Sequence, residues 1–170
     1  MLLRAWVARI GDLITALVHA TVVALASVML LAIGWQVFMR YVFNRPPSWT
    51  EELALLCFTW TMLLMLSVGV RQAFHAHIDL LLKVVPSSVA WWIERAILLL
   101  TALFGAYLAK GGATYVLETA TATSAAIAYP IYALHLAAPV CGALVLWFAF
   151  ERLTLSAATP AITPESPPAQ

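Results

Sequence analysis

Residues 13–39, LITALVHATVVALASVMLLAIGWQVFM, form an uncharged stretch of 27 residues. A helix needs roughly 20 mostly apolar residues to cross a hydrocarbon layer about 30 Å thick. The stretch follows Arg4 and Arg9, and residues 24–26, ALA, resemble the cleavage site of a secretory signal. The core of such a signal, however, has only about 7–15 apolar residues. We therefore predict that the stretch is retained as a first membrane-spanning helix.

Two more stretches of spanning length follow. Residues 53–70 are uncharged, and residues 88–109 reach spanning length if the helix begins ahead of Trp91 and Trp92. Adjacent tryptophans suit the headgroup region, where the amphipathic indole ring is favoured. We predict a second and a third span here.

A fourth apolar stretch covers about residues 127–150, with Pro130 near its start and Pro139 inside it. An internal proline removes one backbone hydrogen bond and bends a helix, which neighbouring helices can accommodate in a membrane. The sequence thus predicts an all-α integral membrane protein with four transmembrane helices.

The composition excludes other classes of protein. Of the 170 residues, 64% are hydrophobic and 10% are charged, whereas a soluble domain is roughly 45–50% apolar and about 25% charged. A soluble enzyme is therefore excluded. Disordered chains combine low hydrophobicity with high net charge, and nucleic-acid partners require a basic surface. The formal net charge of +1 fits neither.

The basic residues divide unevenly between the two sides of the predicted spans. One side carries Arg4, Arg9, Arg71, Lys83, Arg95 and Arg152. The other side carries Arg40, Arg45 and Lys110. Because cytoplasmic loops hold an excess of Lys and Arg, we predict that both termini are cytoplasmic.

We divide the chain into an N-terminal interfacial segment at residues 1–12, a four-helix membrane domain at residues 13–152 and a disordered tail at residues 153–170. The first segment places its arginines opposite apolar side chains, as surface-lying helices do. The tail is rich in proline and has no apolar periodicity. A short interfacial helix is predicted over residues 80–85, with Asp79 as its N-cap.

The segment that leads into the second span has the most specific polar pattern. Ser48 and Glu51 have the spacing of a capping box, in which each side chain accepts a hydrogen bond from the other residue's backbone N–H. Glu51 and Glu52 would then both lie in the first turn, where the helix dipole favours negative charge. The alternative is that one of them pairs with a basic residue of another subunit.

Few polar residues lie inside the predicted spans. His19 and His135 suggest the axial ligands of a haem, but at 1.5 Å per residue they would lie roughly 9 Å apart along the membrane normal. We therefore expect each histidine to hydrogen-bond a neighbouring helix, and no cofactor. Cys57 and Cys141 also fall inside spans, where we expect small hydrophobic side chains rather than a disulfide.

No catalytic constellation accompanies these residues. His75, His77 and Asp79 lie close together, but nothing nearby completes a metal site with recognised spacing. The sequence has no Gly-rich phosphate loop and no nucleophile beside a base. We predict a chain that is not an enzyme and that contains no ion-coupled transport path of its own.

Residues 40–54, RYVFNRPPSWTEELA, closely resemble the segment between the first two helices of the small membrane subunit, of DctQ type, of tripartite ATP-independent periplasmic (TRAP) transporters. Two further motifs of that family follow in order, at residues 77–81 (HIDLL) and 123–127 (TSAAI), the latter with Tyr132, Pro139 and Gly142. The resemblance covers about residues 10–152. It departs at Ala125, where proline is common, and in the two residues that separate Pro139 from Gly142.

The resemblance implies a four-helix scaffold subunit in a bacterial inner membrane. Its partners would be membrane lipids, a large multi-span permease that carries the sodium and substrate sites, and a periplasmic protein that captures an organic acid. The residues it implies at the subunit interfaces are Arg40, Arg45, Trp49, Glu51 and Glu52 near the periplasmic face, and His77 and Asp79 at the cytoplasmic face. The alternative function is a haem- or quinone-associated anchor subunit of a redox complex.

The predicted topology can be tested with reporter fusions. We expect a reporter fused after Arg152 to be active on the cytoplasmic side and a reporter inserted after Asn44 to be active on the periplasmic side, because of the excess of Lys and Arg on the first side. Alkaline phosphatase and green fluorescent protein fusions measure the two locations. The opposite pattern would invert the assigned topology.

Overall fold

The structure is a computed structural model that describes residues 2–72 and 87–156 of the chain. Within these ranges, four helices are long and apolar enough to cross a membrane, which confirms the predicted all-α membrane fold. The helix predicted over residues 80–85 and the end of the predicted tail, from residue 157 on, lie outside the described residues.

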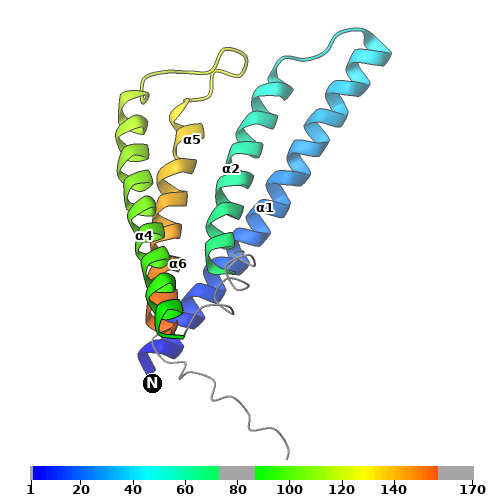
Figure 1. Cartoon of the computed structure of the whole chain (residues 1–170). Helices are drawn as coiled ribbons and strands as arrows, with labels where there is room; N and C mark the ends of the chain where they lie inside the picture. Colours follow the sequence, from blue (N-terminus) through cyan, green and yellow to red (C-terminus); the bar gives the residue numbers. More distant parts are fainter. Residues whose placement is uncertain (1, 73–86, 157–170) are drawn as a thin grey trace, which may run out of the picture.

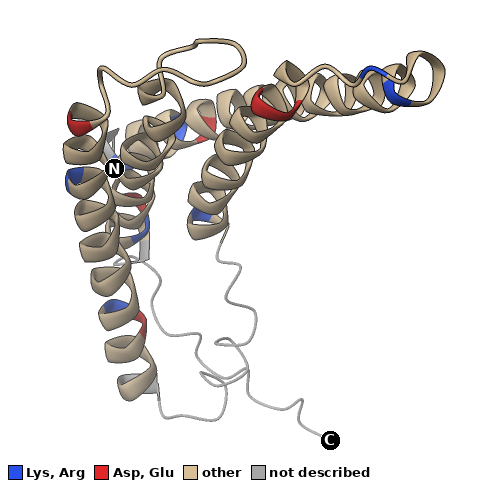
Figure 2. Ribbon diagram, turned by 90° about the horizontal axis from the view of Figure 1, so that it is seen from above, with Lys and Arg blue, Asp and Glu red and all other residues tan. Residues whose placement is uncertain are grey.

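The first helix is longer than a bilayer requires. α1 (Leu2–Phe43) has 42 residues, which corresponds to about 63 Å at 1.5 Å per residue. It passes through residue 12 without a break, so the interfacial segment and the first span form one helix. Seen from above, the end of α1 extends well beyond α2 (Trp49–Arg71) (Figure 2).

The helices form two hairpins that stand side by side (Figure 1). α1 packs mainly against α2, and α4 (Ser87–Glu118) packs mainly against α6 (Ala137–Ser156). α2 also packs against α6 and so joins the hairpins, giving the spatial order α1, α2, α6, α4. The start of α1 and the end of α6 lie at the same end of the bundle, as an even number of crossings requires (Figure 1).

The start of the fourth span differs from the prediction. A short helix α5 (Tyr132–His135) precedes α6, so helix begins at Tyr132 and not near residue 127. Upstream, Ala128 has a left-handed φ of 56°, which a continuous helix excludes, and an isolated antiparallel bridge joins Thr123 to Pro130. Pro139 lies in the first turn of α6, where its missing N–H does least harm.

Glycines let the helices of the second hairpin approach closely. A Cβ on Gly142 of α6 would lie 2.7 Å from the carbonyl oxygen of Gly105 and 2.8 Å from the Cα of Ala109, both on α4. A Cβ on Gly112 would meet Pro139 in the same way. Small residues at such contacts allow the close backbone packing that holds membrane helices together.

The first hairpin contributes a small apolar core. Val18 of α1 packs with Leu64 and Val68 of α2, and all three are buried. Cys57 of α2 and Cys141 of α6 are buried and free.

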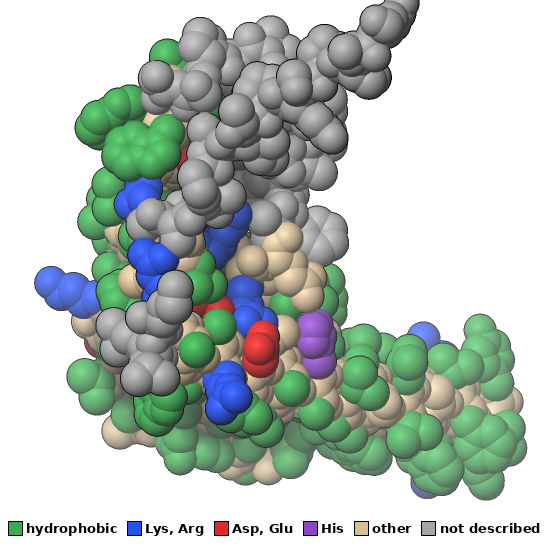
Figure 3. Space-filling model, turned by 90° about the horizontal axis from the view of Figure 1, so that it is seen from below, with side chains coloured by type: hydrophobic (Ala, Val, Ile, Leu, Met, Phe, Trp, Pro, Cys, Tyr) green, Lys and Arg blue, Asp and Glu red, His purple; other side chains and the backbone are tan. Residues whose placement is uncertain are grey.

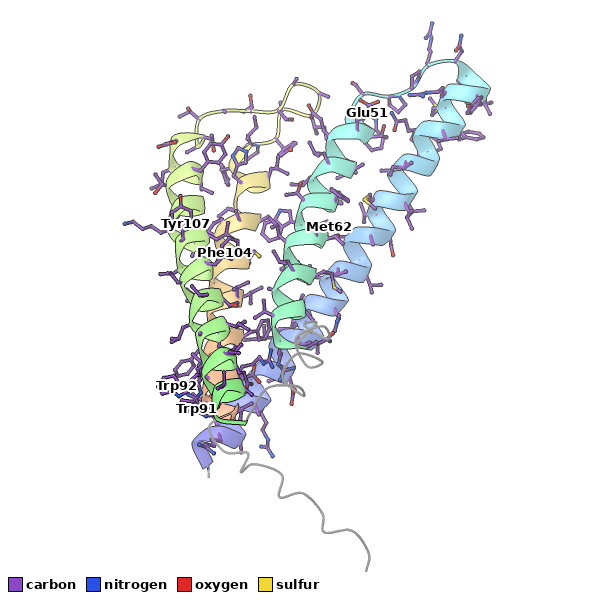
Figure 4. The ribbon with its side chains drawn as sticks, viewed as in Figure 1. Glu51, Met62, Trp91, Trp92, Phe104 and Tyr107 are labelled. Carbon is purple, nitrogen blue, oxygen red and sulfur yellow. The ribbon has the colours of Figure 1, made fainter. Side chains whose placement is uncertain are left out.

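Most large apolar side chains point outward, as expected for helices surrounded by lipid. Trp92 is 68% exposed and Tyr107 is 77% exposed. Trp91 and Trp92 lie at the lower end of the bundle, as the interfacial role predicted for them requires, whereas Met62, Phe104 and Tyr107 lie in its middle (Figure 4). Charged side chains gather where the helices meet at the lower end, while the projecting part of α1 is mainly apolar (Figure 3).

The close packing at Gly142 gives a test of the second hairpin. We expect Gly142→Ala to lower the thermal stability of the detergent-purified protein, because the added methyl group would overlap the α4 backbone. Gly69→Ala in α2 is the matched control, since a methyl group at Gly69 would meet nothing within 4 Å, and alanine there favours helix. Equal melting temperatures for the two variants would contradict the packing described.

Candidate functional site

Arg71, the last residue of α2, connects three helices. Its Nη2 lies 2.7 Å from Asp12 Oδ1 and 2.9 Å from Glu151 Oε1, and its Nη1 donates to Thr15 Oγ1 at 3.0 Å. We call these four residues the Arg71 cluster. Because Asp12 and Thr15 belong to α1 and Glu151 belongs to α6, the cluster fixes both hairpins to one guanidinium group.

The Arg71–Glu151 pair is largely shielded from solvent, whereas Asp12 lies at the open edge of the cluster with 72% of its side chain exposed. The side chain of Glu151 is 2% exposed and that of Arg71 is 19% exposed. A Cβ on Gly11 would overlap the Glu151 carboxyl group, so glycine at this position makes room for the buried carboxylate. A buried charge is costly unless it is paired and hydrogen-bonded, and Arg71 Nε and Nη2 supply those bonds.

Glu52 makes the corresponding contact at the other end of α2. Its carboxylate accepts hydrogen bonds from Ser124 Oγ at 2.7 Å, from the backbone N–H of Ala126 at 2.9 Å and from that of Ile127 at 3.1 Å. We call these four residues the Glu52 site. The three donors belong to the loop between α4 and α5, so Glu52 also joins the first hairpin to the second.

The two contacts are separated by about the thickness of a membrane. Glu52 and Arg71 are 19 residues apart within one helix (71 − 52), which corresponds to about 28 Å. The hydrocarbon layer is about 30 Å thick. Both polar contacts can therefore lie at the membrane faces, where water and headgroups reduce the cost of charge, while the helices between them remain apolar.

Glu51 does not form the predicted capping box. Ser48 has helical backbone angles, φ −71° and ψ −26°, and its side chain makes no capping hydrogen bond, whereas an N-cap residue typically has extended angles. Thr50 Oγ1 donates instead to the carbonyl of Pro47 at 2.7 Å. The Glu51 carboxylate accepts a 2.7 Å bond from Gln36 Nε2 of α1, at the upper end of the first hairpin (Figure 4).

The other residues predicted at subunit interfaces are not gathered into one site. Arg40 and Arg45 are exposed and form no ion pair within the described residues. Trp49 is 41% exposed and lines an apolar groove of about 370 Å³ between α1 and α2, together with Leu31 and Trp35. His77 and Asp79 lie outside the described residues.

His135 and His19, the two histidines considered as haem ligands, lie in different surroundings. Nδ1 of His135 lies 2.8 Å from Thr119 Oγ1, and its ring packs on Tyr115 with centroids 4.4 Å apart. The ring contact is with α4, whereas the hydrogen-bond partner, Thr119, lies one residue beyond the end of that helix. His19 is partly buried on α1. Among the residues that the structure describes, no group of three His, Cys, Asp or Glu could hold a metal ion.

The Arg71 cluster was not predicted from the sequence. The sequence indicates only that Arg71 is one of the basic residues on the predicted cytoplasmic side. It indicates no contact for Asp12, Thr15 or Glu151. A signal was present, because Arg71 ends the second span and Glu151 ends the fourth, so opposite charges reach the same membrane face. What the sequence could not provide is the packing of α2 against α6 that brings them together.

Comparison with known proteins identifies a family that matches most of the chain. Residues 29–159 match the family described as "Tripartite ATP-independent periplasmic transporters, DctQ component". Over 86 residues, or 51% of the chain, the sequence is 29% identical to the C4-dicarboxylate TRAP transporter small permease protein DctQ of Vibrio cholerae, of which the match covers 37%.

Two sialic acid transporter proteins are also similar. The chain is 29% identical over 66 residues, or 39% of its length, to the small permease protein SiaQ of Vibrio cholerae, of which the match covers 38%. It is 41% identical over 54 residues, or 32% of its length, to the permease protein SiaT of Haemophilus influenzae, of which the match covers 9%. The matches thus span less than half of each relative.

The Arg71 cluster predicts a strong and specific loss of stability. We expect Arg71→Met to destabilise the purified protein by about 3–5 kcal/mol, because the buried Glu151 carboxylate would lose its partner. Arg71→Met combined with Glu151→Gln should recover part of the loss, since no buried charge remains. Denaturant titration in detergent measures both.

Arg9→Met is the matched control for that experiment. Arg9 is exposed and lies near the start of α1, the end of the helix that also carries Asp12 and Thr15. The role of the cluster would be contradicted if Arg71→Met were as stable as Arg9→Met. It would also be contradicted if the double variant were less stable than Arg71→Met alone.

Proposed function

This chain belongs to the family of DctQ components of tripartite ATP-independent periplasmic transporters, and we propose that it is the small permease subunit of such a transporter. In this proposal it works in a bacterial inner membrane and takes part in sodium-coupled uptake of an organic acid. The family match over residues 29–159 is the observation that carries the proposal. DctQ components belong to membrane transport systems and are not enzymes, in agreement with the prediction for this chain.

A large permease subunit is the first proposed partner. The segment of this chain that matches SiaT corresponds to only 9% of that permease protein. A sequence similar to this chain therefore occurs within a much longer permease, which supports a functional association between the two parts. The names of the relatives suggest C4-dicarboxylates or sialic acid as substrates to test first.

A scaffold role agrees with where the buried polar side chains lie. Among the described residues, the buried polar ones are Thr15, Thr50, Ser67 and Glu151. Thr15 and Glu151 belong to the Arg71 cluster, Ser67 lies one turn from Arg71, and Thr50 lies at the start of α2. These groups therefore lie near the ends of the bundle. We therefore propose that the sodium and substrate sites belong to the large subunit and that this chain forms part of a fixed frame.

The second proposed partner is a periplasmic substrate-binding protein. The end of the bundle opposite the two described chain ends carries the Glu52 site and the loop between α4 and α5 (Figure 1). The distribution of Lys and Arg favours the periplasmic side for this end. A protein that delivers substrate from the periplasm would reach this end first.

Co-expression with a cognate large permease and a cognate binding protein tests the proposal. We expect the chain to copurify with the large permease in detergent. Proteoliposomes that contain both subunits should take up a radiolabelled organic acid when binding protein and a sodium gradient are supplied, and uptake should be lost without this chain. Full uptake by the large permease alone would contradict the scaffold role, and equal uptake in a potassium gradient would contradict sodium coupling.

The visible absorbance of the same preparation addresses the redox alternative. We expect no Soret band. A Soret band stoichiometric with the protein would instead support a haem-bearing anchor subunit.

A further inference from the structure

The loop between α4 and α5, residues 119–131, has a defined shape without charged side chains. It contains neither glycine nor any Lys, Arg, Asp or Glu. The backbone N–H of Ser124 donates to the carbonyl of Tyr129 at 2.9 Å, and that of Ile131 donates to Ala122 at 3.0 Å. The Tyr129 phenol is neutral at pH 7 at its ordinary pKa of about 10, and burial, followed by the nearby Glu52 carboxylate, raises that pKa further.

Glu52 holds the tip of this loop from the side of α2. The backbone N–H groups of Ala126 and Ile127 point at its carboxylate, as does the Ser124 hydroxyl. Within the loop, Ala128 has a left-handed φ of 56°, a conformation that is unfavourable for alanine and needs support from its surroundings. Charge-assisted hydrogen bonds are about twice as strong as neutral ones, so the Glu52 site supplies that support.

The outer side of the loop tip is open. Ala125, Ala126 and Ala128 are exposed, and Ile127 is 43% exposed. Alanine side chains let another protein approach the backbone closely, and Ile127 offers one apolar anchor. A surface that is already ordered also avoids the entropic cost of ordering on binding.

The chemical groups of the loop favour a protein, and not a free organic acid, as its binding partner. Two N–H donors at the tip of the loop, those of Ala126 and Ile127, are already occupied by Glu52. No basic side chain of the loop could attract an anion. The loop also lies outside the candidate spans, which end at Glu118 and resume at Tyr132, so a water-soluble partner can reach it.

We propose that Glu52 is a positioning residue that holds residues 124–127 as a docking surface for the periplasmic substrate-binding protein. The inference rests on the proposed function. Glu52 acts through the loop, because both of its carboxylate oxygens are bonded within the chain. This differs from direct pairing with a basic residue of another subunit.

Uptake measured against the concentration of binding protein tests the proposal in the reconstituted complex. Glu52→Gln keeps the shape of the side chain but replaces one acceptor oxygen by an NH₂ group, which cannot accept from a backbone N–H. We expect the half-saturating concentration of binding protein to rise by about tenfold, with an unchanged maximal rate and unchanged copurification with the large permease. Hydrogen exchange at the amides of Ala126 and Ile127 should become faster.

Glu118→Gln is the matched control, because Glu118 is an exposed carboxylate at the same end of the bundle, and we expect it to leave the half-saturating concentration unchanged. Ile127→Asn tests the docking surface without adding a charge beside the Glu52 carboxylate, which binds the Ile127 N–H. It should raise the half-saturating concentration by a similar factor while the complex still copurifies.

Two results would overturn the inference. One is faster amide exchange in Glu52→Gln with an unchanged half-saturating concentration. The other is an unchanged half-saturating concentration in Ile127→Asn, which would overturn the inference even if Glu52→Gln fails to assemble. Absence of uptake in the unmodified complex would instead count against the proposed function itself.

Discussion

Both ends of α2 are bound to the second hairpin, and the arrangement of the other helices depends on these two contacts. At one end, the Arg71 guanidinium joins carboxylates of α1 and α6. At the other end, the Glu52 carboxylate binds the loop that leads into α5 and α6. Apolar helices gain little from burying their surfaces against one another in lipid, so such polar contacts can decide which helices are neighbours.

The packing of the helices fits these contacts. Gly11 leaves space for the Glu151 carboxylate, and Gly142 brings α6 against the backbone of α4. Between the ends, Trp60 Nε1 of α2 donates to the carbonyl of Ala133 at 2.9 Å. A row of helices held in this way keeps broad apolar faces free, which can contact lipid or a larger membrane subunit. This arrangement agrees with the frame proposed for this chain.

The length of the apolar stretches and the composition were sufficient to predict the fold class and the number of spans, and local motifs were sufficient to predict the family. Apolar length decides whether a helix can cross a membrane, and a local motif such as residues 40–54 needs no knowledge of tertiary contacts. The predicted start of the fourth span was wrong, because Ala128 has a left-handed φ of 56°. The loop around Ala128 is held by Glu52, which is 74 and 75 residues away in sequence from Ala126 and Ile127. The Arg71 cluster was missed for the same reason, since Arg71 and Glu151 are 80 residues apart.

A distance measurement in the working transporter tests most directly whether the two hairpins form a fixed frame. Spin labels at Met62→Cys in α2 and Tyr107→Cys in α4 would report the separation of the hairpins, since both positions are exposed and the buried Cys57 and Cys141 can be replaced by alanine. Pulsed electron paramagnetic resonance on the complex with the large permease and the binding protein should give one distance distribution, unchanged by sodium or substrate. A distribution that shifts or splits when substrate and sodium are added would contradict a fixed frame.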